Sequence, residues 1–275
     1  MNTKRRVFLL ALAVGAIADA NGAAGLAFDP DGNLFLLGAN PSTIFKFSPN
    51  GQVTAFAEAK EAGEDWNGIA IDARGNVFTA SDATDSEGDA ITRILKWTPA
   101  GKRSVYVANL GKGQSKTLAF DREGNLFVGV TSVSKPRGSD TIYKVAPNAQ
   151  RKGVFTTAIE DPAFFALDHV GNLFVYDESR GISKLTPNGS EVVSMKTGDV
   201  YDLVCDAADN LIVALPHDKK IEKIAPDGTK TTVATDVEPW FLAIDKAGNI
   251  FGLDDGVVKY SPDGKKTLFA PNPIK

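Results

Sequence analysis

The stretch Gly25-Leu-Ala-Phe-Asp29-Pro-Asp-Gly32-Asn33-Leu-Phe-Leu36 decides the fold, because variants of it recur along nearly the whole chain. The shared pattern is an apolar run ending in Asp, two variable residues, Gly-Asn, and a second apolar run. The copies begin near residues 25, 68, 117, 164, 202 and 241. A recurring period of roughly 40 residues is typical of propellers and other repeat architectures. The sequence therefore predicts six copies of one structural unit.

A second signature, Ser48-Pro49-Asn50-Gly51 in the first unit, follows each copy of the first signature. Asp, Asn, Pro and Gly at these positions are typical of tight turns, because Asp bonds its own turn backbone and Gly accepts a positive φ. The two turns divide the first unit into four short strands rich in apolar residues. We predict these strands at Leu26–Phe28, Leu34–Leu37, Ile44–Phe47 and Val53–Phe56.

Two units depart from the turn pattern. Asp209 replaces Gly in the first turn of the fifth unit, and Asp tolerates the left-handed conformation better than most residues. Ala149 replaces Gly in the second turn of the third unit, which predicts a looser or longer turn there.

A four-stranded unit of this size cannot bury both of its faces alone, whereas six units arranged radially can. We predict an all-β, six-bladed β-propeller with four antiparallel strands per blade over residues 21–275. The last predicted strand, Lys266–Phe269, belongs to the sixth unit, so the ring is expected to close by packing blade six on blade one, with a contribution from residues 19–24 as the alternative. A linear β-solenoid is the alternative.

The amino-acid composition excludes several classes of function. The chain has 275 residues, 43% of them hydrophobic, and a formal net charge of −4, which argues against a nucleic-acid partner. A single cysteine, Cys205, excludes an internal disulfide and a zinc site built on a cysteine cluster. Two histidines, His169 and His217, are too few for a three-histidine metal site.

The N-terminus has the pattern of a secretory signal. Lys4-Arg5-Arg6 precedes the apolar run from Val7 to Ala18, and small residues follow. The apolar run is too short to span a bilayer, which needs about 20 residues. We predict a signal peptide over residues 1–20 and a secreted, periplasmic or cell-envelope protein. The alternative is that this segment is a buried element of the fold.

The paired signatures, G-h-A-h-D-x-x-G-N-h-F and then I-x-K-h-x-P-x-G, resemble NHL-repeat proteins and gluconolactonase-like (senescence marker protein, LRE-type) propellers. The likeness covers residues 25–270. It implies a divalent metal in the channel, held by Glu, Asn and Asp at the starts of inner strands, which polarises a lactone carbonyl. Of these positions only Asn67 matches, in Trp66-Asn67-Gly68, whereas Ala24 and Tyr201 occupy the other two.

In a propeller, one face around the channel carries two kinds of connection. These are the loops that precede the inner strands and the loops between the second and third strands. We call this end the channel mouth. Variation there is the functional signal, because the other face carries structural turns. The mouth is predicted to be polar, acidic and partly aromatic. The candidate ligand-binding residues are Asn67, Asp82, Lys116, Asp177, Glu178, Tyr201, Asp202, Trp240 and Asp254.

Four of these residues, Asn67, Asp82, Asp177 and Asp254, are candidate ligands for Ca²⁺ or another divalent metal, unless their carboxylates simply cap strands. Asp202 is not expected to replace a metal-ligating Asp at position 201. A shift of one residue along a strand turns the side chain to the other face of the sheet. Trp66 and Trp240 are the best candidates for exposed anchors, with a core position as the alternative for each.

Two long loops are predicted as neighbours at the mouth, Asp82–Asp89 and Thr131–Asp140. The first is acidic and the second basic, which favours solvated loops that pair with one another. The acidic loop lacks the spacing of an EF-hand. Together with the preceding Glu61–Trp66 segment, these loops make blades two and three the expected docking side.

The sequence favours a non-catalytic, monomeric module that binds a small ligand or a protein partner at the channel mouth. The alternative is a divalent-metal-dependent hydrolase of lactones or esters with a rearranged metal site. A divergent propeller lyase or oxidoreductase is a third hypothesis without a residue signature. No transmembrane span is expected.

Overall fold

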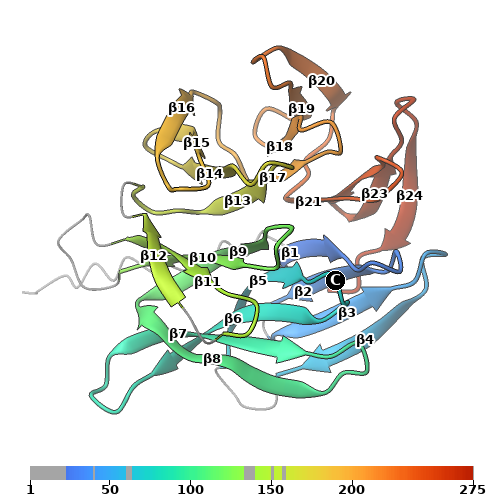
Figure 1. The fold of residues 1–275 in the computed structure, drawn as a ribbon. Helices are drawn as coiled ribbons and strands as arrows, with labels where there is room; N and C mark the ends of the chain where they lie inside the picture. The colour runs from blue at the N-terminus through green and yellow to red at the C-terminus, as the bar shows by residue number, and fades with distance from the viewer. Residues whose placement is uncertain are drawn as a thin grey trace, which may run out of the picture.

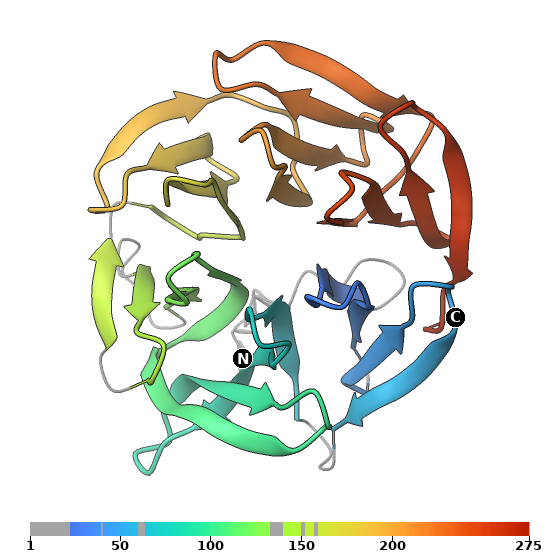
Figure 2. The same ribbon diagram turned by 45° about the vertical axis from the view of Figure 1, so that its right-hand side comes forward.

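The computed structural model describes residues 23–39, 41–59, 64–132, 140–149, 152–156 and 159–274, so the predicted signal segment lies outside it. The described residues form six sheets of four antiparallel strands, arranged as blades of a ring (Figure 2). This confirms the predicted all-β six-bladed propeller. Within this part of the chain, no helix is long and apolar enough to cross a membrane.

Each blade consists of four consecutive strands, and in each the first strand lies innermost (Figures 1 and 2). Blades one to three contain β1 (Ala23–Phe28), β2 (Leu34–Gly38), β3 (Thr43–Phe47), β4 (Val53–Glu58), β5 (Trp66–Ile71), β6 (Val77–Thr84), β7 (Ala90–Trp97), β8 (Arg103–Lys112), β9 (Gln114–Phe120), β10 (Leu126–Thr131), β11 (Thr141–Val145) and β12 (Lys152–Thr156). Blades four to six contain β13 (Phe164–Leu167), β14 (Leu173–Asp177), β15 (Gly181–Leu185), β16 (Glu191–Met195), β17 (Asp202–Cys205), β18 (Leu211–Leu215), β19 (Lys220–Ile224), β20 (Lys230–Thr235), β21 (Phe241–Ile244), β22 (Ile250–Leu253), β23 (Gly256–Tyr260) and β24 (Lys266–Pro271).

The first hairpin of each blade depends on its Asp. In blade one, Oδ1 of Asp29 accepts the backbone N–H groups of Asp31 and Asn33 at 3.0 and 2.8 Å. The Asn33 side chain donates to Oδ2 at 2.7 Å, and Gly32 takes a φ of 83°. Asp209 adopts a φ of 61° at the glycine position of blade five, as its residue type predicts.

The prediction of a looser turn at Ala149 is wrong. Its backbone N–H donates to the carbonyl of Ala146 at 2.9 Å, as that of Gly51 does to Ser48 at 2.8 Å. Ala149 has a φ of 57°, so the turn keeps its shape. A left-handed Ala costs roughly 1–2 kcal/mol, which the flanking hairpin of β11 and β12 can offset.

The acidic segment of blade two is less of a loop than predicted. β6 and β7 stay paired beyond the neighbouring blades' strand ends, through Asp82↔Thr92 to Thr84↔Ala90. The turn is thereby confined to the tip of the hairpin. Of the second predicted loop, residues 133–139 lie outside the described residues, as do residues 61–63 of the preceding segment.

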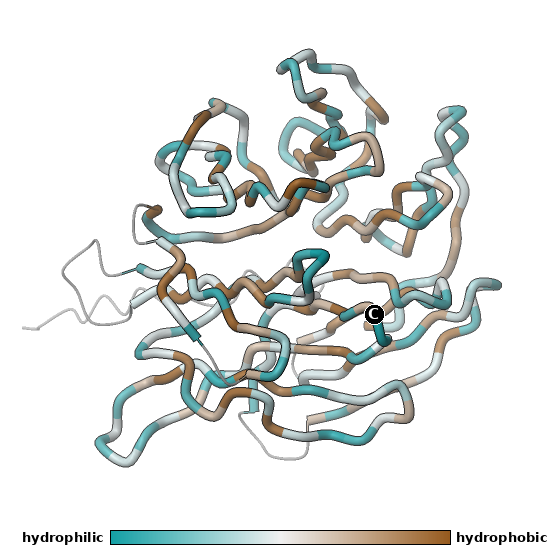
Figure 3. Tube along the Cα trace, viewed as in Figure 1, coloured by the Kyte–Doolittle hydropathy of each residue, from teal (hydrophilic) through white to brown (hydrophobic). Residues whose placement is uncertain are grey.

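The core consists of layers between adjacent blades. Every residue of β2, β10, β14, β18 and β22 is buried, because each second strand is covered on both faces. Hydrophobic residues lie along the strands, whereas hydrophilic residues gather at the hairpin tips (Figure 3). The outer strands are more exposed, and Leu268 on β24 retains 70% of its accessible surface.

Ring closure occurs as the last predicted strand implied, because blade six keeps its own fourth strand and packs on blade one. Phe251 makes edge-to-face contacts with Phe28 at 4.9 Å and with Phe269 at 5.1 Å between ring centroids. Nζ of Lys246 donates to the carbonyl of Pro30 at 2.6 Å. Beyond β24 the chain returns to blade one, where Ile274 lies against Gly38 (Figure 2).

We predict that Phe251→Ala lowers the free energy of unfolding by about 3–5 kcal/mol, the usual cost of removing a buried Phe. The substitution deletes contacts on both sides of the closing interface. Urea unfolding followed by circular dichroism measures the change. Leu268→Ala, on the exposed outer strand of the same blade, should stay within about 0.5 kcal/mol of the wild type. Equal effects of the two substitutions would contradict a closing role for Phe251.

Candidate ligand site at the channel mouth

Strand register places the candidate residues at one end of the ring. The backbone N–H of Tyr201 donates to Ala214 at 3.1 Å, and that of Trp240 donates to Leu253 at 2.9 Å. The starts of these inner strands therefore lie beside the ends of the second strands. The Asp-containing hairpins lie at the opposite end, which we call the turn face.

The channel itself is narrow. A cavity of about 100 Å³ is lined by residues of all six inner strands, and its charged members are Lys116 and Asp202. Nζ of Lys116 is bound by Asp161 of the next blade's entry loop, at 2.9 and 3.2 Å. Binding sites for drug-sized ligands usually measure 300–1,000 Å³, so a larger ligand would rest on the mouth.

Asn67 and Asp82 are brought together at blade two. Nδ2 of Asn67 lies 3.4 Å from Oδ2 of Asp82, and Nε2 of Gln114 donates to the same oxygen at 3.2 Å. Oδ1 of Asp82 is buried without a hydrogen-bond partner among the described residues. Burial, reinforced by the charge of Asp65, raises the pKa of Asp82 to about 6.

The metal site that the resemblance implies does not fit these residues. Its three positions hold Ala24, Asn67 and Tyr201, and alanine offers no side-chain ligand. The amide of Asn67 is turned to Asp82 within its own blade. A Ca²⁺ ion prefers six to eight oxygen ligands, several of them carboxylates. The three implied positions therefore do not offer a complete ligand set for a divalent metal.

Asp177 and Asp254 hold turns in other blades. Asp177 is buried, and its Oδ1 accepts the Ser179 backbone N–H and hydroxyl at 2.7 and 2.6 Å. Asp254 accepts the N–H of Asp255 at 2.8 Å. Of the four candidate metal ligands, Asn67 and Asp82 are thus the one pair whose side chains form a hydrogen bond among the described residues.

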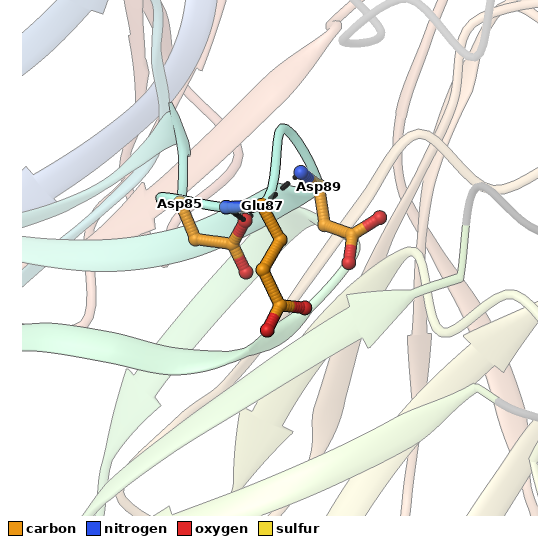
Figure 4. A group of neighbouring side chains, drawn as sticks. All are labelled: Asp85, Glu87 and Asp89. Carbon is orange, nitrogen blue, oxygen red and sulfur yellow. Dashed lines mark hydrogen bonds between the residues drawn. The ribbon is translucent and has the colours of Figure 1, made fainter.

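Asp85, Glu87 and Asp89 form the one group of three potential metal-ligating side chains found in the described residues (Figure 4). They occupy the tip of the β6–β7 hairpin. Oδ1 of Asp85 accepts the N–H groups of Glu87 and Asp89, each at 2.9 Å. Lys112 pairs with Glu87 at 3.6 Å and with Asp89. These contacts explain the cluster as an ordinary turn with an ion pair.

Asp202 turns toward blade six, as the one-residue slip predicts. Its Oδ1 accepts the N–H of Leu203 and its Oδ2 that of Leu242, both at 2.8 Å. The carboxylate thereby ties the inner strands of blades five and six together. Burial raises the pKa of Asp202 to about 7.

An aromatic group occupies the mouth at blades five and six. Tyr201 contacts Trp240 edge-to-face at 4.7 Å and the His217 ring at 5.1 Å. Nδ1 of His217 lies 3.2 Å from Oδ2 of Asp199, and its Nε2 lies 3.4 Å from the Tyr201 hydroxyl. Trp240 and Tyr201 are half-buried, whereas His217 and Asp199 are exposed.

The surroundings of this group are acidic. Burial raises the pKa of Tyr201, and the nearby carboxylates of Asp199 and Glu178 raise it further. Glu178 is exposed at the turn after β14. The aromatic rings therefore lie next to carboxylates that can accept hydrogen bonds.

The expectation that Trp66 is an exposed anchor is wrong. Trp66 retains 1% of its accessible surface and packs edge-to-face on Trp97 at 4.8 Å. Its position at the start of β5 faces it into the layer between blades one and two, with Phe35 and Leu95. Trp240 stands one residue later in its repeat, at the position of Asn67, and is half-buried at the mouth.

Neither a protein-family model nor a curated protein sequence matches the chain. Solved structures do match. Virginiamycin B lyase from Staphylococcus aureus shares 14% identity and a TM-score of 0.65, over 94% of this chain and 86% of the lyase. A protein assigned as a gluconolactonase shares 15% identity and a TM-score of 0.67, over 84% of each chain.

The PQQ-bound aldose sugar dehydrogenase of Streptomyces coelicolor shares 14% identity and a TM-score of 0.63, over 86% of this chain and 88% of that enzyme. At these identities the likeness shows the fold alone. The chain thus has the fold of gluconolactonase-like and related propellers.

Sequence reasoning missed three residues of the mouth: Asp161, Asp199 and Gln114. Each pairing joins residues far apart in the chain, such as Lys116 and Asp161, 45 positions apart. The one local signal was Asp199, two residues before Tyr201 at an inner-strand start.

We predict that the stability of the protein depends on the charge of Asp202. Because its pKa is about 7 in the folded protein and near 4 in an unfolded chain, the unfolded state binds fewer protons between these pH values. The free energy of unfolding therefore falls as pH rises from about 4 to about 7.

Asp202→Asn should flatten this fall, measured by urea unfolding at several pH values. Asp82 contributes to the same fall up to about pH 6 in both proteins, so the difference between them isolates Asp202. An unchanged slope would show that Asp202 does not carry a raised pKa.

Proposed function

We propose that the protein is a non-catalytic binding propeller that holds a small, polyhydroxylated ring at its channel mouth. The observation that carries this proposal is the half-buried Tyr201–Trp240 pair, flanked by His217 and Asp199. Aromatic faces cover the apolar side of a ring-shaped ligand, and a carboxylate accepts hydrogen bonds from its hydroxyls. A few polar groups beside an apolar surface are typical of ligand sites.

The similar structures support a ligand of this chemical class. One is named as an aldose sugar dehydrogenase and another as a gluconolactonase, and both names describe sugars or sugar lactones. Binding without chemistry is supported by the family metal positions, two of which hold Ala24 and Tyr201 in this chain. The N-terminal export pattern supports a location outside the cytoplasm.

The three tryptophans make a direct test. Trp66 and Trp97 retain 1% and 2% of their surface, so Trp240 is the one that a bound ligand can reach. We expect glucose, cellobiose or glucono-δ-lactone to change the tryptophan fluorescence in a saturable manner. Trp240→Phe should abolish the signal, and Tyr201→Ala should raise the Kd at least tenfold.

Val192→Ala, on the exposed outer strand β16, is the control and should leave the Kd unchanged. Circular dichroism verifies that each variant folds. If none of the three probes binds, or if Tyr201→Ala binds as tightly as the wild type, the mouth is not a sugar site.

A second candidate is a divalent-metal-dependent hydrolase of lactones or esters. The observation that favours it is the unpartnered, buried Oδ1 of Asp82 beside Asn67. These two side chains, with Asp65 nearby, would supply oxygen ligands at the edge of the mouth.

Elemental mass spectrometry of the dialysed protein, residues 21–275, separates the two candidates. The binding proposal predicts no stoichiometric metal and no turnover of glucono-δ-lactone with or without added Ca²⁺. About one Ca, Zn or Mn per chain, with turnover that is lost on chelation and in Asn67→Ala, would favour the hydrolase instead.

A further inference from the structure

A large cavity lies on the turn face, opposite the mouth. It measures about 800 Å³ and is formed by blades one, two and six. This volume is within the usual range for small-molecule sites. The sequence pattern predicts only structural turns on this face.

The walls of this cavity are apolar. Phe28, Phe251 and Phe269 form one side, with contacts between ring centroids of 4.9 and 5.1 Å, and Ile71 and Ile244 also line it. The aromatic rings come from the first and last blades. A second turn-face cavity, lined by the equivalent positions of blades three to five, measures about 220 Å³, so the larger volume here accompanies the closing seam.

Four carboxylates line the cavity: those of Asp29, Asp72 and Asp245 are engaged in their turns, whereas that of Asp31 is exposed to solvent. Asp72 accepts the N–H groups of Arg74 and Asn76, each at 2.9 Å, and the Asn76 amide at 2.8 Å. Asp245 accepts the same set of turn donors from Ala247 and Asn249. Asp29 is held in the same way and lies 3.9 Å from Nζ of Lys46.

One cation in the lining lacks the partner that its repeat position provides elsewhere. In blades one, three and four, the lysine of the third strand pairs with the turn Asp of its own blade, as Lys184 does with Asp168 at 3.3 Å. Among the described residues, no such ion pair is formed by the corresponding lysines of blades two, five and six, namely Lys96, Lys223 and Lys259, and of these Lys259 lines the cavity. Its ammonium lies over the Phe251 ring at 5.7 Å, with no carboxylate within 4.0 Å among the described residues.

We propose that this turn-face cavity binds an organic carboxylate with an apolar body, whose head group pairs with Lys259. The apolar body lies against the phenylalanine rings, where it removes apolar surface from water. The carboxylate gains a charge-assisted hydrogen bond from an ammonium that has no competing protein partner. This site is independent of the proposed sugar site, because the two lie at opposite ends of the ring.

Octanoate is the probe, with octan-1-ol and octylammonium as neutral and cationic counterparts of the same length. Isothermal titration calorimetry with the wild type should give binding of octanoate at least tenfold tighter than that of either counterpart. Lys259→Gln should weaken octanoate binding at least tenfold and leave octan-1-ol binding unchanged. Ala73→Trp, on the exposed wall of the cavity, should weaken both ligands.

Lys96→Gln is the matched control. Lys96 occupies the same repeat position in blade two, lies over Phe78 at 5.3 Å and does not line the cavity. The Lys96→Gln variant should bind octanoate like the wild type. The Tyr201→Ala variant should do so too, which separates this proposal from the proposed function.

Several outcomes would overturn the proposal. Absence of octanoate binding, or binding insensitive to Ala73→Trp, would exclude this cavity as the site. Equal affinity for octanoate and octan-1-ol would leave no role for a carboxylate. Tighter binding of octylammonium would reverse the assigned charge, and equal losses in Lys259→Gln and Lys96→Gln would remove Lys259 from the site.

Discussion

The Asp carboxylate in the first hairpin of each blade is the interaction on which the ring depends. In blade four, Asp168 accepts the N–H groups of Val170 and Asn172 and the Asn172 side-chain amide, at 2.7–3.1 Å. The same bonds fix the register between first and second strands in every blade, with small omissions. A shift of one residue would turn every buried side chain to the wrong face. The packing between blades therefore depends on this turn.

This turn also explains how much the sequence could predict. Its Asp, Gly and Asn recur at fixed spacing and act locally, so they predict strand number, blade boundaries and ring size. The mouth is different, because its contacts join separate blades. The pairing of Lys116 with Asp161, and that of Gln114 with Asp82, follows from the way neighbouring blades pack. No spacing within one repeat encodes such contacts.

Trp66 and Trp240 show the same limit at single residues. Both stand at the start of an inner strand, at or next to an equivalent position, and both are apolar and aromatic. Trp66 faces the layer between blades one and two, where Trp97 and Arg103 cover it. Trp240 meets Tyr201 and His217 at the mouth. The cover over Trp66 comes from the later strands β7 and β8 of its own blade, through contacts that the pattern of the inner strand alone does not predict.

The two ends of the ring differ in how regularly they follow the repeat. On the turn face most charged groups are satisfied within a blade, so specificity can arise where the repeat is broken. Blade six meets blade one there, and Lys259, whose ammonium lies over Phe251, lines the cavity that this seam forms. At the mouth, by contrast, each blade presents different residues around a channel that is too narrow for more than a small group.

Asp202 shows how a residue of the channel is used for structure. It follows Tyr201 at the start of β17, and its Oδ2 accepts the N–H of Leu242 in blade six. Backbone N–H groups, those of Leu203 and Leu242, take one acceptor position on each of its two oxygens. In this chain Asp202 thus stabilises the ring, and the recognition that we propose rests on the aromatic rings and carboxylates around the mouth.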